Sequence, residues 1–159
     1  RWCVRGMATH GEGGERVTLT NSIFRGVERE FYNYTENCRY LESLEERKKC
    51  VPAFRSSSGF SERVDTGGSV SDPVSIWFEK IEFLEEEIAR FRIRTIPVAK
   101  MLAYLEECEP ELCRLFYLRY VQQNKWITVE TEMGMSEKAR RTLRKKLVSK
   151  GARFLGVKG

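Results

Sequence analysis

The amino-acid sequence predicts an all-α protein, with a long helical hairpin or coiled-coil stalk followed by a C-terminal helix-turn-helix. Charged residues make up 32% of the 159 positions, whereas Pro and Gly number only 4 and 12. This composition favours helices, because Glu, Lys, Arg and Leu lose little rotamer freedom in them. Two long segments also repeat apolar residues at steps of three and four, the period of one helical face. The 41% hydrophobic content can supply a core.

The distribution of apolar, Ser and Gly residues divides the chain into five segments. The expected order is a flexible tail over 1–20, a helix over 21–54, a Ser- and Gly-rich linker over 55–72, a long heptad helix over 73–108 and a helix-turn-helix domain over 109–159. In the first helix one apolar stripe runs from Phe24 to Leu44, and Asn21 and Ser22 are candidate caps. We expect this helix to end near Cys50.

The second long helix carries the most regular apolar pattern. Its apolar positions alternate steps of four and three from Trp77 to Leu105, as in a coiled coil. Pro97 predicts a kink or a break near residues 93–97, because proline lacks an N–H and clashes with the preceding turn. Two long helices with similar seams fit either an antiparallel pair within one chain or a homodimer formed by the heptad helices.

The C-terminal part reads as a helix from Pro110, a short helix over 126–133 and a basic helix that begins at Ser136. Gly134 can adopt the positive φ of a tight turn, and Ser136 can cap the helix that follows. A helix, a short turn with Gly and a basic helix form the layout of a helix-turn-helix DNA reader. The pattern is short, so a soluble, charged terminal helix remains the alternative.

Charge is concentrated at the C-terminal end. Residues 136–159 contain nine Lys and Arg with Glu137 as the single acidic residue, which leaves the rest of the chain slightly negative and points to a polyanionic partner. The candidate DNA-binding residues are Ser136, Glu137, Lys138, Arg140, Arg141, Arg144, Lys145, Lys146, Lys150 and Arg153. Ala139, Leu143 and Leu147 are expected to pack this helix inward while its arginines point outward.

The sequence lacks the residue patterns of metal sites, disulfide frameworks and common enzyme active sites. The five cysteines form no CxxC pair and His10 is the single histidine, so neither a metal site nor a disulfide framework is expected. A phosphate loop, a nucleophile elbow and paired catalytic carboxylates are also missing from the sequence. We therefore expect a protein without enzymatic activity and without a cofactor. The sequence has no apolar run of membrane-spanning length, so we expect a soluble protein of the cytoplasm.

Three stretches carry a family resemblance: the Ser-Gly linker that ends in SDPV (71–74), LRYVQQNKW (118–126) and EMGMSE (132–137). Over about residues 22–150 the chain resembles small bacteriophage-encoded transcriptional regulators of the RinA/ArpU type, whose C-terminal part is similar to region 4 of bacterial sigma factors. The resemblance implies activation of phage genes in a bacterial host through binding of double-stranded promoter DNA. It also implies host RNA polymerase as a second partner.

Two positions depart from that pattern. Glu130 stands where the first helix of the motif usually has a small residue, and Arg140 stands where the recognition helix usually has a buried aliphatic residue. We expect the helix to be rotated so that Ala139 takes the inward position. Two other functions combine the same kinds of segment: a small terminase-like subunit for DNA packaging, and a helical adaptor between proteins.

Overall fold

The computed structural model describes residues 19–52 and 73–157, and all regular structure within these ranges is helical. The elements are α1 (Asn21–Lys49), α2 (Pro73–Cys108), α3 (Pro110–Phe116), the π-helix η1 (Tyr117–Val121), α4 (Trp126–Met133) and α5 (Glu137–Phe154). The predicted all-α class is thus confirmed for the described part of the chain. The tail expected over 1–20, apart from Leu19 and Thr20, and the linker expected over 55–72 lie outside the described residues.

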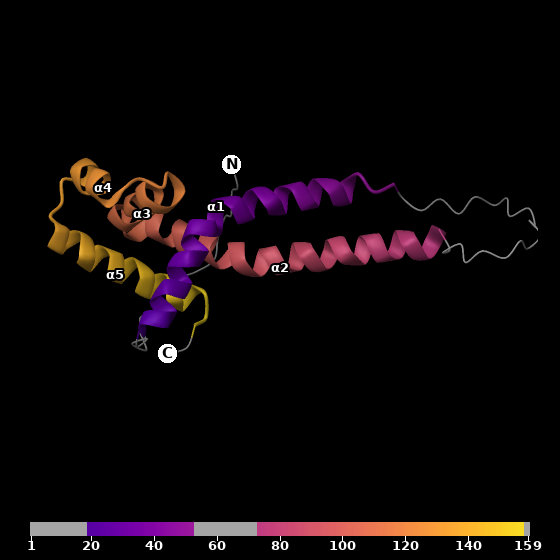
Figure 1. Ribbon diagram of the computed structural model, residues 1–159, viewed down its shortest axis with the longest axis horizontal. Coiled ribbons are helices and arrows are strands. Elements are labelled where there is room, and N and C mark those ends of the chain that lie inside the picture. Colours follow the sequence, from indigo (N-terminus) through magenta and orange to yellow (C-terminus); the bar gives the residue numbers. More distant parts are fainter. Residues whose placement is uncertain (1–18, 53–72, 158–159) are drawn as a thin grey trace, which may run out of the picture.

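The seams of α1 and α2 face each other within one chain. The two helices run side by side in opposite directions (Figure 1), and Leu44 packs with Leu84 and Ile88 in a small buried cluster between them. An ion pair of 2.7 Å between Lys48 Nζ and Glu85 Oε1 joins their surfaces. Along this stretch the apolar stripes of α1 and α2 are therefore buried against each other within one chain.

The ends of α1 differ slightly from the sequence expectation. The cap is Thr20, whose Oγ1 accepts a hydrogen bond from the backbone N–H of Ile23 at 3.3 Å. The proposed caps Asn21 and Ser22 instead lie inside the first turn. Thr20 serves because its backbone is extended, as a capping residue requires. The helix ends at Lys49, next to the predicted Cys50.

The break expected near Pro97 is absent, because α2 continues through this residue to Cys108. Thr95 and Val98, on either side of it, are 4% and 1% exposed. The Thr95 hydroxyl donates a hydrogen bond of 2.9 Å to the carbonyl of Phe91. Burial of the seam on both sides of Pro97 offsets the lost backbone hydrogen bond and keeps one helix. A bend at Pro97 stays a prediction.

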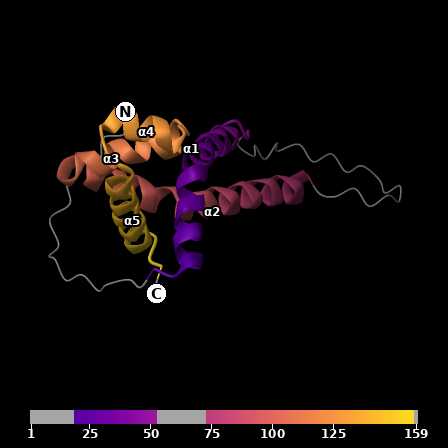
Figure 2. The same ribbon diagram turned by 60° about the vertical axis from the view of Figure 1, so that its left-hand side comes forward.

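The first half of α1 belongs to a second, larger core. The helix bends, so that its first half crosses α5 while its second half follows α2 (Figures 1 and 2). Val27 and Phe31 are buried with Phe116 of α3 and Leu147 of α5. The rings of Phe31 and Phe116 meet edge to face with centroids 5.2 Å apart. One continuous helix thus joins the α1–α2 pair to the C-terminal helices.

The crossing of α1 and α5 depends on Gly151. A Cβ atom at this position would overlap the buried ring of Phe31 and a methyl group of Val27. We expect Gly151→Ala to lower the free energy of unfolding by about 1–3 kcal/mol, because neither neighbour has room to move. Gly26 of α1 has open space where its Cβ would lie, so Gly26→Ala should raise that free energy by about 0.5–1 kcal/mol. Urea unfolding of both variants measures the two changes in stability. Equal stabilisation by both substitutions would contradict the close approach of α5 to α1 at Gly151.

Candidate nucleic-acid interface

The turn between α4 and α5 has the geometry that its residues predict. Gly134 ends α4 in the left-handed conformation with φ of 61°. Ser136 caps α5, because its side-chain oxygen accepts a hydrogen bond from the Ala139 backbone N–H at 3.3 Å. The two helices are thus joined by a short, well-defined turn, and α5 begins with its first N–H groups at the surface.

Trp126, at the start of α4, is covered by guanidinium groups. The Arg119 carbon Cζ lies 4.8 Å from the ring centroid, and those of Arg140 and Arg144 lie 5.2 and 5.4 Å away. A guanidinium within about 6 Å of an indole face is attracted by the ring quadrupole. Trp126 therefore fastens α4 to η1, which carries Arg119, and to α5, which carries the other two arginines.

Arg140 does not point outward as the sequence analysis expected. Its side chain is 17% exposed, and its Nε lies 3.0 Å from Oε1 of Glu130 on α4. A second contact of 3.3 Å joins it to Glu137. Glu130 and Arg140 are the two departures from the family pattern, and they compensate each other, because the charge of one is neutralised by the other across the helix pair. Ala139 beside them is half-buried.

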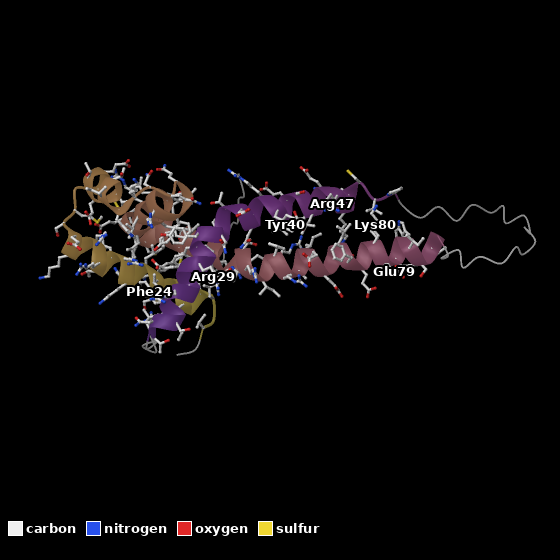
Figure 3. The ribbon with its side chains drawn as sticks, viewed as in Figure 1. Phe24, Arg29, Tyr40, Arg47, Glu79 and Lys80 are labelled. Atoms are coloured by element: carbon white, nitrogen blue, oxygen red, sulfur yellow. The ribbon has the colours of Figure 1, made fainter. Side chains whose placement is uncertain are left out.

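Arg144 is also turned inward, onto a buried carboxylate of α1. Its Nε and Nη2 donate to the two oxygens of Glu28 at 2.7 and 2.6 Å, the two-pronged geometry of a strong arginine–carboxylate pair. The hydroxyl of Tyr120 donates to Glu28 at 2.7 Å. Glu28 is 8% exposed, so its charge depends on these partners. The Arg144 guanidinium also lies over Phe24, which Figure 3 shows on the first half of α1.

The contacts among Glu28, Tyr120 and Arg144 shift the pKa values of Tyr120 and Arg144. Burial, reinforced by the Glu28 carboxylate, raises the pKa of Tyr120 well above its usual range. Hydrogen bonds to Glu28 raise the pKa of Arg144. Both shifts keep the proton on the donor, so that Tyr120 stays neutral and Arg144 stays charged. Glu28 could not be predicted from the sequence, because a single acidic residue beside an apolar stripe carries no local signal.

Two lysines of α5 are held by one carboxylate. Lys146 and Lys150 both form ion pairs with Glu109, the residue between α2 and α3. Burial raises the pKa of Glu109, but the two ammonium groups outweigh this effect and the net shift is downward. Lys150 also lies 4.8 Å from the ring centroid of Tyr104 on α2. These two candidate DNA-binding cations therefore fasten α5 to the end of α2.

The remaining cations form a narrow surface on the outer side of α5. Lys138, Arg141 and Lys145, which we call the basic face of α5, follow one another at steps of three and four and are all exposed. The Arg141 side chain is 69% exposed and pairs at 2.5 Å with Glu137, itself exposed in the first turn. Of the other candidates, Ser136 is exposed at the start of the helix and Arg153 near its end. Lys146 is exposed as well, with 55% of its side chain open to solvent, but it is paired with Glu109. The cations that are exposed and bound to no other described element are fewer than the sequence suggested.

Metal and membrane features are missing from the described residues. Within 19–52 and 73–157, His, Cys, Asp and Glu side chains do not gather into a group that could hold a metal ion. None of the helices in these ranges combines the length and the apolar content needed to cross a bilayer. Comparisons of the chain with protein-family models, curated proteins and solved structures found no significant match.

Proposed function

We propose that the protein is a sequence-specific regulator of transcription that binds double-stranded DNA through the basic face of α5. The observation that carries this proposal is that the cations of α5 form two groups, one bound to other elements and one facing solvent. Arg140, Arg144, Lys146 and Lys150 are bound to acidic or aromatic partners of other elements, whereas Lys138, Arg141 and Lys145 face solvent together. A helix whose inner side is bound to the rest of the protein and whose outer side is basic suits insertion into a major groove.

The chemistry of the first turns fits base recognition. A recognition helix meets base edges with its N-terminal residues, and an arginine can donate two hydrogen bonds to guanine. Lys138 and Arg141 occupy the first turns of α5, and Lys145 and Arg153 lie farther along, where phosphates would be reached. Glu137 pairs with Arg141 at the surface, so binding would exchange an exposed, weak ion pair for a contact with DNA.

The biological setting of the proposal comes from the sequence resemblance. The RinA/ArpU-like stretches support activation of phage genes in the cytoplasm of a bacterial host, with host RNA polymerase as a second partner. The turn residues Gly134 and Ser136, which belong to the most specific of these stretches, adopt the conformations that a helix-turn-helix needs. This local agreement supports the proposal over a merely soluble terminal helix.

A DNA titration at several salt concentrations tests the proposal. We expect the logarithm of the association constant to fall linearly with the logarithm of salt concentration, by about 0.9 for each phosphate that is neutralised. Fragments selected from a phage genome should bind at least about a thousandfold more tightly than random duplex of the same length. Binding that is insensitive to salt, or equal for selected and random fragments, would refute a sequence-specific DNA reader.

A further inference from the structure

α2 carries a second heptad row on the side away from α1. This outer row of α2 alternates steps of four and three and consists of Glu79, Phe83, Glu86, Arg90, Ile93, Pro97 and Lys100. Each member lies two residues after a seam position, which turns it by roughly 200° around the helix. Figure 3 shows Glu79 on the side of α2 that faces away from α1. Every member of this row is exposed except Pro97, which is half-buried.

The apolar members of the outer row are unusually open to solvent. Phe83 is 57% exposed and Ile93 is 74% exposed, although both lie in the middle of a long helix. Ile76 and Ile96 near the same row are 52% and 45% exposed. Large apolar side chains gathered on one surface commonly mark a contact with another protein. The regular spacing further indicates that the partner is another helix.

The charges along the outer row are arranged to match a reversed copy of the same row. Its acidic members, Glu79 and Glu86, precede the midpoint, and its basic members, Arg90 and Lys100, follow it. A second α2 that runs antiparallel, with a two-fold axis between residues 86 and 90, brings Glu86 opposite Arg90 of the other copy. The same register brings Phe83 opposite Ile93 of the other copy. The two-fold axis repeats both contacts, so one row supplies both sides of the interface.

We propose that the protein forms a homodimer in which the outer rows of two α2 helices pack antiparallel. The apolar contacts between Phe83 and Ile93 supply the attraction, and the pairs between Glu86 and Arg90 set direction and register. A parallel pair would instead place Glu86 beside Glu86 and Arg90 beside Arg90, and like charges would repel. This dimer leaves the α1–α2 seam intact, and it is independent of DNA binding.

Exchanged charges test the interface. Glu86→Arg and Arg90→Glu each create two like-charged contacts in the dimer, so each variant alone is expected to be monomeric at concentrations where the wild type is dimeric. An equimolar mixture of the two variants should recover the dimer, because every contact in the mixed pair is then between opposite charges. Sedimentation equilibrium over a range of protein concentrations measures both states, and circular dichroism verifies that each variant remains helical.

Substitutions on α1 provide the control. Glu36 and Arg39 are exposed on α1 and lie outside the outer row. Glu36→Arg and Arg39→Glu are therefore expected to leave the wild-type mass unchanged. A wild-type chain that stays monomeric at all concentrations overturns the proposal, and so does a dimer that persists in both single α2 variants. A mixture that fails to dimerise overturns the antiparallel register.

Discussion

Replacing Arg144 by Met is expected to lower the free energy of unfolding by about 2–3 kcal/mol. The substitution leaves the Glu28 carboxylate, which is 8% exposed, with only the Tyr120 hydroxyl as a partner. Breaking a buried ion pair is costly because the remaining charge is left without a counter-charge and without hydration. The expected value is near the lower end for such pairs, since the Arg144 side chain is itself 36% exposed. Urea denaturation followed by circular dichroism measures it.

A double-mutant cycle identifies the cause of that loss. Glu28→Gln in the Arg144→Met background removes the unpaired carboxylate. The double variant should therefore be more stable, by about 1–3 kcal/mol, than the sum of the two single losses predicts. The exposed ion pair of Lys48 and Glu85 is the matched control. Lys48→Met should cost less than about 1 kcal/mol. Additive losses in the Glu28 cycle would show that the two residues are not coupled.

The second large effect concerns DNA. Changing Lys138, Arg141 and Lys145 together to Ala is expected to weaken binding to duplex DNA on the order of 100-fold at physiological salt. The salt slope should fall by about 2.7, because three phosphate contacts are lost at about 0.9 each. All three side chains are exposed, so the free energy of unfolding should stay within about 0.5 kcal/mol of the wild type. Fluorescence anisotropy of a labelled duplex measures affinity and slope together.

A charge-matched variant separates local contact from net charge. Arg39, Lys49 and Lys80 lie exposed on α1 and α2, and their replacement by Ala removes the same two lysines and one arginine. This control should change DNA affinity less than about threefold at physiological salt, because distant charges are screened beyond roughly 8 Å. Equal weakening by both triple variants would mean that DNA responds to overall charge and not to α5.

Local sequence patterns predicted the starts of several helices, the turn before α5 and the buried side of α2. Pro73 and Pro110 begin α2 and α3, as expected of a residue that fits the first helical turn. Gly134 and Ser136 mark the turn before α5, because positive φ and capping favour those residue types. The seam from Trp77 to Leu105 is buried or half-buried at each predicted position. Such features depend on neighbours within a few residues, which is why a pattern can reveal them.

The partners of the basic helix could not be predicted in this way. Glu28 and Arg144 are 116 positions apart, and their contact depends on how α1 crosses α5. Glu109 likewise gathers Lys146 and Lys150 from another element. A count of cations along α5 treats all of them alike, whereas in the described part of the chain Arg140, Arg144, Lys146 and Lys150 bind acidic residues of other elements and the rest do not. Fewer of the predicted cations on α5 are therefore free of contacts to other described elements than the sequence suggested, and DNA binding by this helix stays a prediction.

The continuity of α1 has a consequence for how the chain can be divided. Val27, Glu28 and Phe31 fill the interior of the C-terminal helices, while Leu44 of the same helix packs against α2. A fragment that begins at residue 109 would keep the basic face of α5 but lose these three side chains from its interior. We therefore do not expect the sequence boundary before Pro110 to be a boundary of folding. Residues 19–52 and 73–157 are expected to unfold as one cooperative unit.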